Sequence, residues 1–537
     1  MTESETILRE YNCIYKNLKN GFFSDDKDDD FDYSIKKINI LASFAWQYHP
    51  GLYSDCEIEK KIFTLSERIA ANESIDGSEI DDSTFEQPAT AEKKRVVHIA
   101  TSVFYVGGHT RLLYNLVKRD VESCHYLIIT RQDSGFVPVW LINAIELSGG
   151  KVHCLSDSAD MWDNALKIRR IVKKFADFVF LHIHPDDALS LVALAANRTQ
   201  PIIFINHADH VFSLGCSLSD VVACIRPWSA SFSIKRRLAK KVNILPIPLD
   251  FEKAAIPSKK EARDILGIEP NTVVILTVAS AYKFIPDEKY NYFRFVKSIV
   301  DRNANVFVKV IGVSGDDAEM VGYIPDSRIE LVGLVENPII FYKAADIYLD
   351  CMPFASFTSL FEAIYFGAYP VLQYAPAEKL LVANDPGIGK IVTHSQNEEE
   401  LLTVVESAIN NAELRDEVSL QIAKNIEFNH CGIGWNDYLN KIYEDSLSAA
   451  LEKPTIDFDS YTVFSNDSDD LESATSPKIL KFDKEKYLIN FFYLNYKKLL
   501  TRDLIRAYWL SMSCVNRISI FQYTKSLLRL IQLKVIN

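Results

Sequence analysis

Several common features are missing from this chain of 537 residues. Its nine cysteines are scattered singly, with no C-x-x-C pair and no signal peptide before them. This usage favours reduced thiols in a cytosol over a disulfide framework or a zinc ribbon. No uncharged run approaches the roughly 18 to 20 apolar residues that a membrane-spanning helix needs. The sequence therefore predicts a cytoplasmic protein that does not cross a membrane.

Charge is unevenly distributed along the chain. The formal net charge is −13. Residues 478–537 hold 12 Lys and Arg against 3 Asp and Glu, a net +9 that leaves −22 for the remainder. Such an asymmetry is typical of an interaction tail. The mixture of basic, aromatic and aliphatic residues suits either the acidic body of the protein or the inner face of an anionic membrane, and it gives no reason to expect nucleic acid as a partner.

Changes of pattern along the chain predict six segments. Residues 94–257 and 258–453 each alternate strands of four to seven residues with helices, which predicts two doubly wound Rossmann-like α/β domains. Ligands bind at the carboxyl ends of such strands, so we expect the two domains to face a cleft. The flanking segments are an α-helical appendage (1–80), a linker (81–93), a disordered linker (454–477) and a basic amphipathic helical tail (478–537).

The most informative stretch runs from Cys351 to Tyr374. An apolar strand, Asp346–Cys351, is followed by a loop of small polar residues, a helix, Gly367 and a second strand, Tyr369–Tyr374. Ser356, Thr358 and Ser359 lie where the helix begins, a position whose backbone N–H groups and helix dipole favour phosphate. Glu362 is the only carboxylate of that helix and could accept hydrogen bonds from a ribose, although an N-cap with a solvated glutamate is the simpler alternative.

Polar residues also follow other predicted strands. Ser280 ends the predicted strand Val273–Ser280 and Lys283 follows it, where a lysine could neutralise a diphosphate leaving group. In the first domain, Gly107 and Gly108 open a helix that brings His109 and Arg111 towards the ligand-binding edge. Two histidine clusters end neighbouring strands there. These clusters contain His182, His184 and Asp186, and His207, Asp209 and His210.

The histidines leave two kinds of chemistry open. A four-histidine metal site joined by Asp186 is conceivable, but none of the familiar ligand spacings is present. Hydrogen bonding to sugar hydroxyls and general acid/base chemistry suit these residue types better. We therefore predict no metal and no cofactor.

The ordered set of Gly107–Arg111, His182–Asp186, Asn206–Gly215, Tyr282–Lys283 and Pro353–Ala363 resembles bacterial GT-B nucleotide-sugar glycosyltransferases of the surface-polysaccharide type. The likeness covers about residues 94–450 and is similar in outline to glycosyltransferase family 4, whose second domain carries two glutamates separated by seven residues. Glu362 matches the second glutamate, whereas Phe354 stands at the first and leaves the donor-sugar contact unassigned.

The resemblance implies an acceptor-side first domain and a donor-side second domain. It implies that His207 approaches the donor sugar, that Lys283 and Ser356–Ser359 hold the diphosphate, and that Glu362 binds the ribose. It also implies that a last helix, Trp435–Tyr443, returns to the first domain.

The function expected from sequence is transfer of a sugar from a nucleotide-sugar to a carbohydrate or lipid-linked acceptor, with His207, Asp186 and Lys283 as catalytic candidates. A sugar-nucleotide epimerase of GT-B type is one alternative, which Asp186 and Asp209 support. A non-catalytic GT-B scaffold that binds a partner transferase is another, which Phe354 supports. The nucleotide, sugar, acceptor, linkage and oligomeric state stay open.

Overall fold

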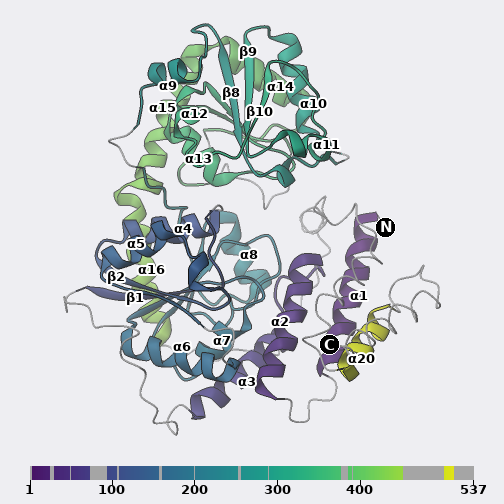
Figure 1. Ribbon diagram of the computed structural model, residues 1–537, viewed down its shortest axis with the longest axis vertical. Coiled ribbons are helices and arrows are strands. Elements are labelled where there is room, and N and C mark those ends of the chain that lie inside the picture. Colours follow the sequence, from purple (N-terminus) through teal and green to yellow (C-terminus); the bar gives the residue numbers. More distant parts are fainter. Residues whose placement is uncertain are drawn as a thin grey trace. The chain divides into compact units, whose positions relative to one another are not determined.

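The computed structural model describes residues 3–23, 30–48, 50–72, 93–105, 108–155, 160–198, 200–251, 256–287, 289–375, 385–389, 391–451 and 501–512. The chain forms two compact units (Figure 1). The first contains residues 1–225, 229–244 and 439–537, and the second contains 226–228 and 245–438. The cleft expected between the two domains stays a prediction.

The first unit is built on a parallel sheet of seven strands in the order β3-β2-β1-β4-β5-β6-β7. The strands β2, β4, β5 and β6 are buried along their whole length, as expected where helices cover both faces of a parallel sheet. The strands are β1 (Lys94–Ala100), β2 (Ser123–Ile129), β3 (Val152–Cys154), β4 (Phe178–His182), β5 (Ile202–Asn206), β6 (Val221–Cys224) and β7 (Val242–Ile244).

Helices follow the strands in the alternation that the sequence predicts. They are α4 (Gly108–Arg119), α5 (Val139–Ser148), α6 (Met161–Phe175), α7 (Ala188–Leu194) and α8 (Pro227–Arg237). Asp160 caps α6 by accepting a hydrogen bond from the Asp163 amide at 2.7 Å, as its position before an amphipathic run suggests. The helix α16 (Ile433–Leu451) joins this unit from Leu439 onward, and the Tyr443 hydroxyl donates to the Asp120 carboxylate.

The helices before the first sheet share its core. The helices α1 (Glu3–Phe23), α2 (Phe31–Tyr48) and α3 (Cys56–Asn72) contribute Tyr15, Leu41 and Ile62 to the apolar cluster that also contains Val97 and Ile99 of β1. The sequence predicts an α-helical appendage over residues 1–80, and these helices are present in the structure. Their buried residues belong to the same apolar cluster as the sheet of the first unit.

The second unit has a smaller parallel sheet of five strands in the order β10-β9-β8-β11-β12. Its strands are β8 (Val273–Val278), β9 (Val306–Ile311), β10 (Ile329–Gly333), β11 (Ile347–Leu349) and β12 (Tyr369–Val371). Its helices include α9 (Lys259–Ile265), α10 (Tyr292–Arg302), α11 (Ala318–Val321), α12 (Ile339–Ala344), α13 (Phe357–Tyr365), α14 (Glu398–Asn410) and α15 (Ala412–Ile426).

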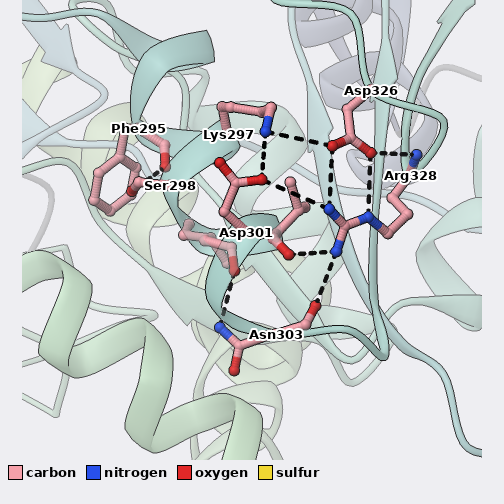
Figure 2. Close-up of polar contacts among 9 residues, drawn as sticks. Phe295, Lys297, Ser298, Asp301, Asn303, Asp326 and Arg328 are labelled. Atoms are coloured by element: carbon pink, nitrogen blue, oxygen red, sulfur yellow. Dashed lines mark hydrogen bonds and ion pairs between the residues drawn. The ribbon is translucent and has the colours of Figure 1, made fainter.

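An ion-pair network ties the end of α10 to the segment before β10 (Figure 2). The guanidinium of Arg328 contacts both carboxylate oxygens of Asp326 at 3.1 Å, and Lys297 lies 3.6 Å from the same carboxylate. Hydrogen bonding to Arg328 lowers the pKa of Asp326 to about 2. The network fixes a surface corner of the unit and contains none of the predicted site residues.

Two parallel sheets with helices confirm the α/β class with two doubly wound Rossmann-like domains. The apolar triplet Ile391–Thr393 predicts a further strand of the second domain, and this prediction is wrong, because these residues form no strand in the structure. The predicted linkers and most of the predicted tail lie outside the described residues, which leave out 81–92, 454–477, 478–500 and 513–537. None of the described helices combines the length and apolar character needed to cross a bilayer.

Candidate functional site

In the second unit, a buried aspartate organises the loop between β11 and α13. Asp350 follows β11 directly, and its Oδ1 accepts hydrogen bonds from the amides of Cys351 at 2.9 Å and Ser356 at 3.0 Å. Burial raises the pKa of Asp350 to about 6, although these amides and the charge of Lys283 oppose the rise. The loop that precedes α13 is therefore held from within by one carboxylate.

The hydroxyl groups predicted at the start of the helix lie where the sequence places them. Ser356 is the N-cap residue of α13, but its side chain caps no backbone N–H group. Its Oγ lies 3.3 Å from the Oγ of Ser359, and Thr358 and Ser359 are partly buried. The first turn of a helix leaves backbone N–H groups without intrahelical acceptors. This turn therefore combines N–H groups and hydroxyls, the donors that suit an anion.

Lys283 lies beside this helix start. Its Nζ donates to the carbonyl of Ala355, the residue before the N-cap, at 3.0 Å. Ser280 is exposed and precedes the short 3₁₀ turn Ala281–Phe284, whose geometry directs Lys283 back to the loop. The structure thus brings a cation and the N-terminus of α13 together from two separate strands.

Glu362 is held by a phenol from a different helix. The Tyr342 hydroxyl, on α12, donates to Glu362 Oε2 at 2.8 Å. Burial, followed by the Glu362 carboxylate, raises the pKa of Tyr342 well above its usual range, so the phenol stays protonated and donates. Glu362 is partly buried and so is Phe354, which replaces the first glutamate of the family pattern.

In the first unit, histidines from three segments meet near the carboxyl ends of β1, β4 and β5. The ring centroids of His109 and His207 are 4.3 Å apart, and those of His109 and His184 are 5.8 Å apart. His109 Nε2 lies 2.9 Å from the backbone oxygen of His182. The structure therefore brings together His109, His182, His184 and His207.

These histidines are neutral near pH 7. Burial lowers the pKa of His109 to about 4 and that of His184 below its usual value. Burial, with His109 and His182 nearby, lowers the pKa of His207 well below its usual range. A carbonyl oxygen only accepts, so His109 donates through Nε2 to His182 and His207 donates through Nδ1 to the Ile205 oxygen at 3.2 Å. Their other ring nitrogens are acceptors.

Asp186 is engaged by an arginine that the sequence did not single out. Arg131 Nη1 lies 3.2 Å from the Asp186 carboxylate, and Arg131 Nη2 donates to the Asp186 carbonyl at 2.8 Å. The next residue, Asp187, accepts from Thr101 at 2.8 Å and from Thr130 at 2.7 Å. These bonds fix the segment between β4 and α7.

The segment after β5 is fixed by the buried guanidinium of Arg237. It donates to Asn206 Oδ1 at 2.7 Å and to the Ala208 carbonyl at 3.0 Å. Asp209 is buried, and His210 is a partly exposed neighbour whose Nδ1 lies 3.6 Å from the Asp209 carboxylate. This segment presents His207 to His109, while Asp209 faces the interior.

The predicted glycine turn is only partly described. Gly107 lies outside the described residues, and Gly108 is the first residue of α4. Arg111 is exposed, and its guanidinium lies 4.7 Å from the ring centroid of Trp140 rather than among the histidines. In the described part of the chain, no group of three or more His, Cys, Asp or Glu residues is arranged to hold a metal ion.

Sequence reasoning missed Asp350, Tyr342, Arg131 and the buried histidines His98 and His125. Asp350 lies near the end of a predicted apolar strand, and His98 is a single polar residue inside another. His125 lies just before the predicted strand Tyr126–Thr130, which in the structure begins at Ser123. Their roles depend on which strands are neighbours, which a single sequence does not state. Tyr342 could have been singled out only from knowledge that α12 packs against α13.

Comparisons with known proteins find similarity only in structure. No protein-family model and no curated protein matches this chain. A glycosyltransferase from Rickettsia africae is 14% identical, with 66% of this chain and 99% of that chain covered and a TM-score of 0.49. The O-GlcNAc transferase of Thermobaculum terrenum is 11% identical, with coverages of 78% and 79% and a TM-score of 0.49.

A third similar structure is Anabaena Alr3699/HepE in complex with UDP and glucose. It is 12% identical, with 65% of this chain and 99% of that chain covered and a TM-score of 0.47. All three TM-scores lie below 0.5.

Proposed function

We propose that this chain is a GT-B glycosyltransferase that moves a sugar from a nucleotide-sugar donor to a carbohydrate or lipid-linked acceptor. The role we assign is synthesis of a cell-surface polysaccharide or glycoconjugate at the cytoplasmic face of the membrane. The observation that carries the proposal is the helix start at Ser356, with Lys283 next to it and Glu362 held by Tyr342 on the same helix.

This arrangement matches the two polar parts of a nucleoside diphosphate. The N–H and hydroxyl groups at Ser356–Ser359 suit the diphosphate, and the Lys283 ammonium adds charge that gains importance as the leaving group departs. The Glu362 carboxylate suits the ribose hydroxyls, which donate hydrogen bonds. In this proposal the second unit binds the donor.

The first unit supplies the chemistry for a neutral, hydroxyl-bearing acceptor. His109, His184 and His207 offer neutral imidazole nitrogens as hydrogen-bond acceptors, and His207 is the residue we assign to the reacting sugar. The His182 carbonyl positions His109 from the end of β4, and Asp186, which is paired with Arg131, follows in the same segment. The proposal includes no metal, so activity should survive a strong chelator. A loss of activity that added zinc or manganese restores would contradict this prediction.

The alternatives find less support in the same residues. An epimerase would need Asp186 or Asp209 as an acid or base, but Asp186 is paired with Arg131 and Asp209 is buried. A non-catalytic scaffold is still suggested by Phe354 at the first glutamate position. Nucleotide release that depends on an added acceptor separates an enzyme from a scaffold.

The experiment that tests the proposal is mass spectrometry of products formed with a panel of nucleotide-sugars and acceptor glycans. The expected result is a mass increase of one glycosyl residue on an acceptor, together with release of a nucleoside diphosphate. Donor binding without any transfer across the panel would favour the scaffold, and conversion of the donor sugar without an acceptor would favour the epimerase.

A further inference from the structure

Three buried histidines form a hydrogen-bonded line across three neighbouring strands of the first sheet. They are His125 on β2, His98 on β1 and His182 on β4, and each is 0% exposed. His98 Nε2 lies 2.9 Å from His125 Nδ1, and His98 Nδ1 lies 3.1 Å from His182 Nε2. We call these three residues the histidine line.

The strand register explains why the rings meet. His125 pairs with Val96 and His182 pairs with Ala100, the residues two positions before and after His98 on β1. Side chains two positions apart on a strand share a face. The line therefore runs diagonally across one face of the sheet and ends at the carboxyl edge, where His182 adjoins His109.

Hydrogen-bond chemistry fixes the tautomer of every ring. His125 Nε2 lies 3.0 Å from the carbonyl oxygen of Asp120, which only accepts, so this nitrogen carries the hydrogen. Burial lowers the pKa of all three rings, so each is neutral and carries one hydrogen. His125 Nδ1 therefore accepts from His98 Nε2, and His98 Nδ1 accepts from His182 Nε2.

The two ends of the line differ in chemistry. At the site end, His182 Nδ1 keeps a lone pair and is buried with no hydrogen-bond partner among the described residues. At the other end, the Asp120 carboxylate lies 3.8 Å from His125 Nε2 and accepts from Tyr443. In the described part of the chain, Lys93, Lys94 beside the Tyr443 ring, His109 and His207 also face the line.

We propose that the histidine line is a proton relay that removes the proton of the acceptor hydroxyl and delivers the positive charge to His125. This proposal rests on the glycosyl transfer proposed above. The hydroxyl O–H bond breaks as its oxygen attacks the sugar, and the proton reaches His182 Nδ1 through one water molecule. The Nε2 hydrogen of His182 then moves to His98 Nδ1, and the Nε2 hydrogen of His98 moves to His125 Nδ1.

The final state places an imidazolium next to a carboxylate. His125 then carries hydrogens on both nitrogens and pairs with Asp120, the only carboxylate that the structure places against the line in its described part. The pKa of His125 is lowered by burial and raised by Asp120, whereas burial and neighbouring histidines hold the pKa of His98 well below its usual range. A charge on the line is accordingly most stable at His125.

The first test determines which ring nitrogens carry hydrogen, and it does not require transferase activity. The full chain is labelled with ¹⁵N-histidine, and proton–nitrogen correlation spectra are recorded as the pH is lowered from 7. The expected result is three neutral rings with hydrogen on Nε2, of which His125 gains its second hydrogen first. Hydrogen on Nδ1 of His98, or protonation of His182 before His125, would overturn the relay.

The second test interrupts the line without removing its hydrogen bonds. In His98→Gln, the amide oxygen can accept from His182 and the amide nitrogen can donate to His125, but an amide does not pass a proton on. We expect kcat for transfer to fall about a hundredfold or more while nucleoside diphosphate binding is unchanged. His153→Gln, on β3 of the same sheet and outside the line, is the matched control.

The outcomes separate the relay from the proposed function. If kcat of His98→Gln equals that of the wild type in a folded protein, the relay is wrong although the transferase stands. If no transfer is found with any donor and acceptor, the proposed function fails, and the labelled-histidine titration then decides the tautomer order and the site of protonation by itself.

Discussion

The hydroxyl of Tyr33 donates a hydrogen bond of 2.5 Å to the carboxylate of Asp503, although the two residues are 470 positions apart in sequence. Asp503 belongs to α20 (Thr501–Met512), which lies beside α1 in Figure 1. Leu504, Ala507 and Tyr508 of α20 are 0% exposed and belong to the core of the first unit. This part of the basic tail is therefore a structural brace on the N-terminal helices.

Because α1 and α20 approach each other closely, we expect a single methyl group added between them to lower the stability of the protein. A Cβ added to Gly21 would lie 3.0 Å from the Ala507 Cα and 3.2 Å from its backbone nitrogen. Overpacking of this kind costs about 1 to 3 kcal/mol, which outweighs the roughly 1 kcal/mol that alanine gains over glycine inside a helix. We expect Gly21→Ala to lower the melting temperature.

The matched control for that variant is Gly135→Ala, where an added Cβ would meet nothing within 4 Å. Its melting temperature should equal that of the wild type. A Gly21→Ala variant as stable as the control, measured by thermal denaturation, would contradict the packing of α20 on α1.

Removal of residues 478–537 tests the two roles of the tail together. We expect a lower melting temperature, because the deletion exposes the apolar surface that α20 covers on α1. We also propose that basic residues of the tail outside α20 bind anionic membranes, at about 1 kcal/mol per residue near the surface. Co-sedimentation with anionic liposomes should then be lost on deletion; an intact protein that never sediments would refute the membrane role alone.

The ionisation of Asp350 predicts a pH-dependent stability difference. The pKa of the Asp350 carboxyl is about 6 in the folded protein, whereas an aspartate in the unfolded chain has a pKa near 4. The carboxyl therefore contributes most to the free energy of unfolding below about pH 4, where it is neutral in both states. This advantage is lost as the pH rises through about 6. The variant Asp350→Asn stays neutral but keeps the oxygen that accepts from Ser356. The melting temperature of the wild type minus that of Asp350→Asn should therefore decrease between pH 4 and pH 7, and a constant difference would contradict the buried, shifted carboxyl.

Lys283 should act on the leaving group more than on ground-state binding. The diphosphate gains charge as the glycosidic bond breaks, so a fixed cation stabilises the transition state preferentially. Lys283→Ala is expected to lower kcat more than it weakens donor affinity. Lys289→Ala is the control, since Lys289 also donates to a backbone carbonyl, that of Ala375 at 2.7 Å. A higher KM with an unchanged kcat would mean that Lys283 contributes only to binding of the donor in the ground state.

Apolar runs made much of the sheet framework predictable from sequence. The run Arg95–Ala100 predicts a strand, and the structure extends it by one residue to Lys94. The short strands β6 and β7 escaped prediction because runs of three or four residues between loops give no periodicity. Ile391–Thr393 shows the opposite error, since an apolar triplet need not pair with a sheet.

The candidate site was predictable only in part. Ser356 and Lys283 lie in the connections that follow β11 and β8, so the rule that ligands bind at the carboxyl edge was enough to single them out. His98 and His125 lie inside strands, and their contact depends on the order β2-β1-β4 and on a diagonal register. Strand order is set by packing of the whole sheet, which no local pattern encodes.

The central claim is that α13 binds a nucleotide, and calorimetric titration of a nucleoside diphosphate into Glu362→Ala tests it most directly. A hydrogen bond to a charged group contributes about 1.5 to 3 kcal/mol, so the affinity should fall about ten- to a hundredfold relative to the wild type. Glu406→Ala, a carboxylate of α14 paired with Arg302 at 3.4 Å on the surface, should bind like the wild type. Equal affinity of folded Glu362→Ala and wild type would contradict the account.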